Sequence, residues 1–224
     1  MLNLTSGDLS IKMSLISDNA DPRFTKLVKI YQASIEPSEQ KPLEVLRGMV
    51  GDARYAFHVL EALDDVIGFA IVFTPADREF WLLEYIAIEA TRRDAGIGIE
   101  LFMRVAKAMS NENPSACGLL EVDQAIGDAN AAAQARRRLG FYARCGCKML
   151  QGLTYILPLE SNHAPTAMHI LLWGQLHSAI SKETLTRWLR IIYSDVYLQS
   201  SSDFRISQMV ENLPDRIKLL SSFS

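Results

Sequence analysis

The sequence predicts a mixed α+β core, in which strands and helices follow one another along a chain of 224 residues. Three observations predict it. A buried strand, a glycine loop and an amphipathic helix succeed one another over residues 81–109. Shorter strand and helix patterns lie on both sides of that stretch, and the sequence has no internal repeat or low-complexity tract. We expect the core to span residues 11–174, and residues 175–224 to form a helical extension that packs on the core or lies at a homodimer interface.

The central stretch begins with a segment whose side chains are almost all apolar. Residues 81–88 are rich in aromatic and β-branched side chains, as interior strands are, and Glu84 is their one charge. Gly96 and Gly98 follow in a short loop. Apolar residues then recur at every fourth position, which predicts one buried face of a helix: Ile97, Leu101, Val105 and Met109.

Before this stretch, the hydrophobic pattern switches between the helical and the strand period. It predicts strands at residues 11–16, 55–60 and 66–74, and helices at residues 22–33 and 43–50. Asp21 is expected to cap the first helix. Residues 34–42 contain two prolines and are expected to form a loop, and Asp64 with Asp65 a hairpin turn.

After the central stretch, the sequence predicts a strand at residues 118–122 and an alanine- and arginine-rich helix that ends near Arg144. A closing pair of strands is expected at residues 148–157 and 168–173. The tail is expected to hold a helix at 182–198, a serine-rich linker and a shorter helix at 204–212.

Composition narrows the class of protein. Hydrophobic residues make up 49% and charged residues 22%, which is typical of a globular domain, and a net charge of −3 argues against a broad nucleic-acid surface. Three cysteines make a disulfide framework unexpected. The start of the chain lacks the pattern of a signal peptide, and the longest apolar run is too short to span a bilayer. We therefore expect a cytoplasmic protein with neither a nucleic-acid nor a membrane partner.

A glycine loop that opens a helix predicts an anion site. The first turn of a helix has unpaired N–H groups and a partial positive charge, and Gly96 and Gly98 let the backbone approach a phosphate. Arg93 can add an ionic contact. A P-loop would need Lys and Ser or Thr where Ile99 and Glu100 stand, so that motif is excluded. A dinucleotide fingerprint is also excluded, because its third glycine is replaced by leucine.

The spacing Arg-x-x-Gly-x-Gly after a strand ending Tyr-Ile-Ala-Ile resembles the acyl-CoA loop of the GNAT N-acetyltransferases. The resemblance implies the GNAT acyl-CoA N-acyltransferase fold, with acetyl-CoA in a gap beside the central strand. It implies that the strand backbone binds the pantetheine amides at Ile86, Ala87 and Ile88. It also implies that the loop backbone holds the pyrophosphate at Arg93, Asp94, Ala95, Gly96, Ile97 and Gly98. Asp94 departs from the family pattern; it would repel a pyrophosphate unless it points outward, or it simply caps the helix.

A second part of the resemblance lies downstream. Asn130 and Ala133 resemble the family's Asn-x-x-Ala, and the segment from Phe141 to Cys147 resembles its Phe-Tyr-x-x-x-Gly-Phe, with cysteine in place of the last phenylalanine. The resemblance implies that Asn130 contacts the cofactor and that Tyr142 is the general acid that protonates the leaving thiolate. The two parts are further apart here than in the family. Alternatively, Tyr142 is a core tyrosine at a helix end.

Acetyl transfer to an amine needs a base, because an amine with a pKa of about 10.4 is almost fully protonated at pH 7. Glu84 is the first candidate, since burial raises the pKa of a carboxyl towards neutrality. Glu121 on the neighbouring strand is the second. Each is alternatively a structural carboxylate. Residues 34–42 are expected to cover the acceptor site, as in the family.

The resulting hypothesis is an acetyl-CoA-dependent N-acetyltransferase that acetylates a primary amine of a small molecule by direct transfer. Two alternatives stay open: a non-catalytic acyl-CoA-binding module, and an acetyltransferase acting on a protein or peptide amine. We expect no metal, because Cys117, Cys145 and Cys147 lack the spacing of a four-ligand site.

Overall fold

The computed structural model describes residues 11–93, 96–158, 167–175 and 178–223. The chain divides into two compact units. The first takes in the residues up to 72 together with 84–105, and the second takes in residues 73–83 and those from 106 onward. Strand β4, Phe80–Ile88, contributes its first half to the second unit and its second half to the first unit.

The first unit is built on the strands β1 (Ile11–Ile16), β2 (Tyr55–Ala62), β3 (Asp65–Phe73) and the end of β4, which are neighbours in that order. β1 and β2 pair antiparallel from Ile11 opposite Ala62 to Ile16 opposite Phe57. The hairpin between β2 and β3 turns at Leu63 and Asp64, which both have positive φ, as tight two-residue hairpins require. The turn therefore lies one residue earlier than the sequence predicts.

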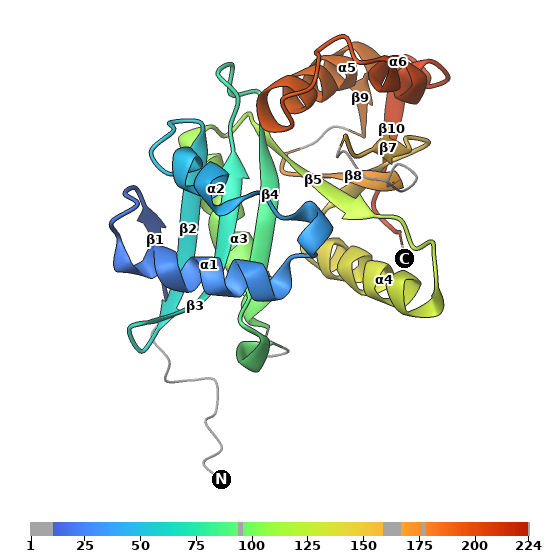
Figure 1. Cartoon of the computed structure of the whole chain (residues 1–224). Helices are drawn as coiled ribbons and strands as arrows, with labels where there is room; N and C mark the ends of the chain where they lie inside the picture. The colour runs from blue at the N-terminus through green and yellow to red at the C-terminus, as the bar shows by residue number, and fades with distance from the viewer. Residues whose placement is uncertain (1–10, 94–95, 159–166, 176–177, 224) are drawn as a thin grey trace. The chain divides into compact units, whose positions relative to one another are not determined.

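Two helices of the first unit, α1 (Pro22–Ser34) and α2 (Leu43–Met49), cover one face of these strands, and α3 (Ile97–Glu112) starts on the other face (Figure 1). Asp21 caps α1 by accepting a hydrogen bond from the Arg23 main-chain N–H, as predicted. A short 3₁₀ turn, Pro37–Glu39, interrupts the expected loop between the two helices.

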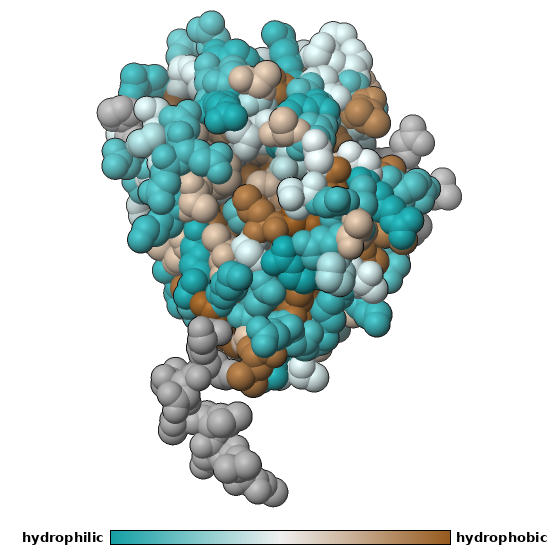
Figure 2. Space-filling view, turned by 90° about the vertical axis from the view of Figure 1, so that its left-hand side faces the viewer, coloured by the Kyte–Doolittle hydropathy of each residue, from teal (hydrophilic) through white to brown (hydrophobic). Residues whose placement is uncertain are grey.

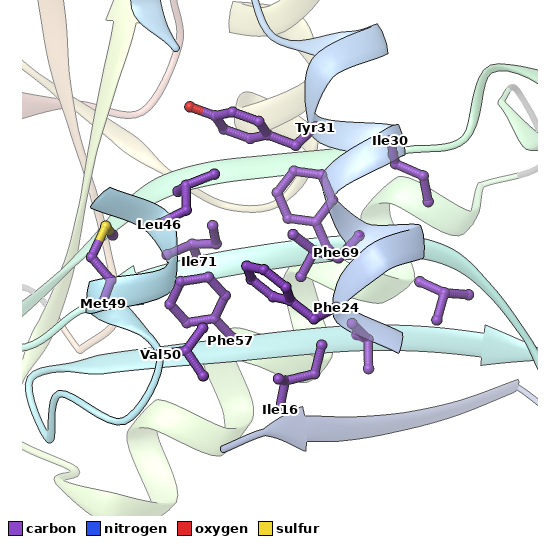
Figure 3. Close-up of a cluster of buried hydrophobic side chains, with 13 residues drawn as sticks. Ile16, Phe24, Ile30, Tyr31, Leu46, Met49, Val50, Phe57, Phe69 and Ile71 are labelled. Carbon is purple, nitrogen blue, oxygen red and sulfur yellow. The ribbon is translucent and has the colours of Figure 1, made fainter. Parts of the chain in front are cut away.

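Apolar side chains from α1, α2, β2 and β3 form the core of this face (Figure 3). Phe57 and Phe69 are almost fully buried there, and each such side chain contributes about 1.5–3 kcal/mol by leaving water. The Tyr31 ring packs 6.1 Å from that of Phe69, and its hydroxyl points out of the cluster. Tyr85 and Ala87 of β4 pack against the same cluster.

The second unit is built on the first half of β4 and on six further strands of the same sheet. Their order is β4, β5 (Cys117–Asp123), β8 (Ala167–Trp173), β6 (Lys148–Leu150), β10 (Arg216–Leu220) and β9 (Ala179–Ser181), and β7 (Tyr155–Ile156) also pairs with β8. β4 and β5 run parallel, whereas β8 pairs antiparallel with β5, β6 and β7, and β10 pairs antiparallel with β6 and β9. Gly118 fits where no side chain would, because a Cβ there would lie 2.3 Å from the ring of Trp81.

The helices of the second unit are α4 (Ala129–Arg144), α5 (Lys182–Ile191) and α6 (Phe204–Val210), besides the end of α3. Asp128 caps α4 through the main-chain N–H groups of Asn130 and Ala131. A π-helical turn, Ile192–Val196, continues α5 and ends at Tyr197.

Two expectations about the second half of the chain are wrong in detail. The strand expected at residues 148–157 is two strands, β6 and β7, because the chain turns between them at Gly152, whose φ is 81°. The tail is not only helical: β9 and β10 are strands, and β10 pairs with β6. Such pairing joins segments that are far apart in the sequence, so the residue pattern of a five-residue segment does not predict it. The division into domains at residue 174 stays a prediction.

The described helices and one face of the surface can be compared with what the composition predicts for a globular domain. No helix among them is long and apolar enough to cross a bilayer. Figure 2 shows a face on which hydrophilic residues predominate, with hydrophobic residues scattered among them.

Candidate active site

Strand β4 changes character halfway along. Its ladder with β5 runs from Phe80 opposite Cys117 to Leu83 opposite Leu120, and these β4 residues are buried. From Glu84 onward the residues are partly exposed until Ile88. The Glu84 side chain is itself only 3% exposed, so the exposed surface of that residue is main chain. Residues 84–87 are thus the part of the strand that is partly exposed, and the binding of acyl-CoA by the backbone of Ile86, Ala87 and Ile88 stays a prediction.

The loop after β4 is held by its own strand and by α1. A 3₁₀ turn, Ala90–Arg92, leads into it, and Arg93 donates from Nε to the Ile88 carbonyl at 3.2 Å and from Nη2 to Ser34 Oγ at 3.0 Å. Asp94 and Ala95 lie outside the described residues. Arg93 thus fixes the loop, and an ionic contact from it to a phosphate stays a prediction.

Helix α3 opens at the second end of this loop. Gly96 has a φ of 75°, a conformation that favours glycine, and its carbonyl accepts hydrogen bonds from the main-chain N–H groups of Ile99 and Glu100. The first N–H groups of a helix have no partner within the helix, and the helix dipole is positive at this end. Gly96, Ile97 and Gly98 thus lie at the start of this helix, and their role in binding an anion stays a prediction.

Glu84 carries the buried carboxylate of the first unit. Its Oε1 accepts a hydrogen bond from Lys41 Nζ, in an ion pair whose side chains are 3% and 17% exposed. Its Oε2 is buried and has no hydrogen-bond partner among the described residues. Burial raises the pKa of Glu84 above 4.5, and the charge and hydrogen bond of Lys41 lower it in part. The Glu84 carboxyl therefore binds a proton more readily than an exposed glutamate does.

Two tyrosines hold the segment that presents Lys41. The Lys41 main-chain N–H donates to the Tyr31 hydroxyl at 2.7 Å, and the Tyr85 hydroxyl donates to the Glu39 carbonyl at 2.9 Å. The two rings meet edge to face, with 5.0 Å between their centroids. Burial raises the pKa of Tyr31, and the negative charge of Glu84 contributes in the same direction. The sequence offered no signal for Lys41, because nothing local links it to a strand 43 residues away.

Glu121 lies in the second unit and has different partners. Tyr197 donates its hydroxyl to Glu121 Oε2 at 2.5 Å. Tyr155 from β7 is fully buried, and burial, followed by the charge of Glu121, raises its pKa well above 10. The groups that interact with the Glu121 carboxylate therefore include the phenols of Tyr197 and Tyr155. Tyr197 follows the π-helical turn, so the expected extension does contact this candidate residue, which the sequence did not predict.

Tyr142 and Asn130 lie on α4, also in the second unit. Burial raises the pKa of Tyr142, and the nearby thiols of Cys147 and Cys145 act in the same direction. The phenol therefore keeps its proton at neutral pH, as a proton donor must. Asn130 is exposed in the first turn of α4, where its main-chain N–H is taken by Asp128. The roles of both residues stay predictions.

Metal-ligating side chains do not gather anywhere in the described ranges: no group of three or more His, Cys, Asp or Glu residues could hold an ion. The three cysteines are free and buried, which confirms that they form no disulfide framework. Burial raises the pKa of Cys145 to about 11, so its thiol stays protonated at neutral pH.

No family model matches the chain, and no curated protein matches it either. Solved structures do. A Bacteroides thetaiotaomicron protein assigned to the GNAT family of acetyltransferases aligns with a TM-score of 0.68 and 19% identity, over 83% of this chain and 98% of its own. A protein from Desulfovibrio desulfuricans assigned to the same family aligns with a TM-score of 0.53 and 20% identity, over 74% and 99% of the two chains.

An N-acetyltransferase from Staphylococcus aureus Mu50 is similar to a comparable extent, with a TM-score of 0.56 and 12% identity over 73% of this chain and 97% of its own. Each of these neighbours is matched almost completely, whereas this chain has residues beyond the match. Identities this low establish the arrangement of strands and helices. The chain therefore has the fold of the GNAT acetyltransferases, as its sequence predicts.

Proposed function

We propose that the protein is an acetyl-CoA-dependent N-acetyltransferase that moves an acetyl group to a primary amine of a small molecule. The observation that carries this proposal is the buried Glu84 carboxylate, which already holds a primary ammonium and lies on the strand that leads into the glycine loop. The GNAT fold of the chain supports it.

The chemistry requires a neutral amine. Glu84 takes a proton from the acceptor ammonium, directly or through water, and the raised pKa of its carboxyl suits that task. The amine nitrogen then forms a bond to the thioester carbonyl carbon, and the carbon–sulfur bond breaks. Tyr142 donates its proton to the leaving thiolate. The nitrogen loses its second proton as it becomes an amide, and that proton returns to the Tyr142 phenol, directly or through water. Glu121 is the alternative base.

The backbone of β4 and of the loop would hold the acyl-CoA. By the resemblance, Ile86, Ala87 and Ile88 bind the pantetheine amides, while the loop from Arg93 through Asp94 and Ala95 to Gly98 binds the pyrophosphate. The partial exposure of residues 84–87 and the positive φ of Gly96 support this assignment. Asn130 is the proposed further contact. A cytoplasmic location and a homodimer stay predictions.

One observation favours a second function, a module that binds acyl-CoA without transferring the acyl group. Lys41 is bonded to Glu84, so the candidate base is occupied by a cation of the same chain. A module of this kind would bind acetyl-CoA and leave all amines unmodified.

The first test is thermal unfolding with and without acetyl-CoA, with NAD and ATP as controls. A ligand at a hundredfold its dissociation constant stabilises by about 2.7 kcal/mol, which is a shift of about 5–11 °C for a chain of this size. A shift with acetyl-CoA alone supports the loop assignment. Release of free thiol from acetyl-CoA in the presence of polyamines, amino acids or peptides then separates the enzyme from the binding module and small acceptors from peptide acceptors.

A further inference from the structure

The contact between Lys41 and Glu84 is an ion pair buried within the first unit. The Glu84 side chain is 3% exposed and that of Lys41 is 17% exposed. A buried carboxylate that loses its cation is left uncompensated in a medium of low dielectric constant, which is strongly unfavourable. Glu84 therefore needs a cation beside it whenever it is ionised, and here Lys41 supplies that cation.

The cation that fits this place is a primary ammonium on an unbranched alkyl chain. An ammonium is a compact charge with three N–H donors, whereas a guanidinium is a wide planar fork. Glu84 Oε1 takes one N–H of Lys41, and Oε2 is buried with no hydrogen-bond partner among the described residues. A carboxylate whose first oxygen already accepts a hydrogen bond can still accept one from a second N–H donor through its other oxygen.

Lys41 reaches this place from a segment that is fastened at two points. Tyr31 accepts from its main-chain N–H, and Tyr85 bonds to the carbonyl of Glu39 two residues earlier. These contacts involve the main chain of residues 39–41, so the Lys41 side chain can leave Glu84 without breaking either of them.

We propose that Glu84 is the centre of a primary-ammonium site, that the Lys41 side chain fills this site when no substrate is bound, and that the acceptor amine enters by displacing Lys41. This inference rests on the proposed function and names its substrate class: an unbranched primary alkylamine that is cationic in solution. We expect branched, quaternary and guanidinium compounds to bind less well, because the cation that Glu84 holds in this structure is the unbranched ammonium of Lys41. Lys41 is thus an internal competitor of the acceptor.

Chemical rescue tests the site without relying on turnover. Lys41→Ala removes the atoms from Cγ to Nζ, and n-propylammonium is the missing piece. We expect n-propylammonium to raise the melting temperature of Lys41→Ala in a saturable way, by about 5–11 °C at a hundredfold its dissociation constant. 1-Propanol and tetramethylammonium are the matched controls. Glu84→Gln in the Lys41→Ala background should abolish the shift.

Kinetics tests the competition. Lys41→Gln keeps a hydrogen-bond donor beside Glu84 and removes the charge, so the KM for a primary alkylamine should fall several-fold relative to the wild type. Lys12→Gln, which changes an exposed lysine on β1, is the matched control and should leave that KM unchanged. An unchanged or higher KM in Lys41→Gln means that the ion pair is only structural.

The outcomes separate this inference from the proposed function. Equal shifts with 1-propanol and n-propylammonium overturn the ammonium site, and so does a Lys41→Ala chain that stays unfolded in n-propylammonium. A wild-type protein that acetylates amines while Lys41→Gln leaves KM unchanged overturns displacement and keeps the enzyme. Rescue without any acetyl transfer by the wild type keeps the ammonium site and rejects the acetyltransferase.

Discussion

Glu84 and Glu121 lie on adjacent strands and are both candidates for the catalytic base, but the structure gives them different partners. Glu84 is bonded to a cation, the ammonium of Lys41. Glu121 accepts from the neutral hydroxyl of Tyr197 at 2.5 Å and lies close enough to Tyr155 to raise the pKa of that phenol. A cation balances the charge of a carboxylate and can be exchanged for a substrate cation, whereas a phenol only donates a hydrogen bond. The comparison shows that the charge and hydrogen bonding of a glutamate on a strand are set by the partner that a distant segment of the chain supplies.

The largest effect should come from removing the base. Glu84→Gln should lower kcat about 10²–10⁴-fold, the usual contribution of a positioned base. Glu121→Gln is the matched variant on the neighbouring strand and should act much less. The ratio of the two kcat values, measured by thiol release at saturating acetyl-CoA, ranks the candidates. A larger loss in Glu121→Gln would reverse the assignment.

Breaking the ion pair on one side should reduce stability by about 3–5 kcal/mol, because it strands a buried charge. Lys41→Met is the variant to use, since it keeps most of the alkyl volume. Urea unfolding of the single variants and of Lys41→Met/Glu84→Gln closes a double-mutant cycle. The double variant should be more stable than Lys41→Met alone; strict additivity of the two changes would show that the pair is uncoupled.

His58 is a buried titratable group for which burial is the cause of the pKa shift and no charged partner appears among the described residues. It is 3% exposed on β2, and burial lowers the pKa of its imidazole from 6.5 to about 4. Because the unfolded chain binds a proton first, stability is full above pH 6.5 and falls as the pH drops towards 4, by about 3 kcal/mol in total. Urea unfolding of the wild type and of His58→Phe between pH 7 and pH 4 measures this loss. If the free energy of unfolding falls with pH to the same extent in the wild type and in His58→Phe, the loss does not come from His58.

The smallest effect should follow from Tyr197→Phe. The hydrogen bond from this phenol to Glu121 is charge-assisted when the carboxylate is ionised, and its removal should reduce stability by about 1.5–3 kcal/mol. If Glu84 is the base, the pH profile of kcat/KM should not move. A shift of the acidic limb to higher pH would make Glu121 the titrating group and overturn the ranking.

The sequence predicts the features of this molecule that local physics determines. Residues 81–88 form a strand because their side chains are mostly large and apolar, and Asp21 caps a helix because its carboxylate accepts from the main-chain N–H of Arg23 in the first turn. The helix that follows the glycine loop begins at Ile97, as the local pattern predicts. The expected fold followed from that stretch, and the solved structures confirm it.

The partners of the candidate residues could not be predicted. Lys41 is 43 residues from Glu84 and Tyr197 is 76 residues from Glu121, so no spacing rule connects them. The strand Arg216–Leu220 is equally hidden, because its identity depends on pairing with β6. Contacts of this kind depend on the whole fold. A single sequence shows which residues are present but not which of them meet.

The contact between Tyr197 and Glu121 depends on the type of helical turn that precedes Tyr197, which is a π turn. A π turn holds one more residue than an α-helical turn. If residues 192–196 formed a regular α-helical turn instead, the extra residue would rotate the following side chain by about 100° about the helix axis. Tyr197 would then face away from Glu121 although every side chain in the contact is retained. The phase of the helix, and not only the identity of its residues, therefore decides whether the end of the chain reaches the strand that carries Glu121.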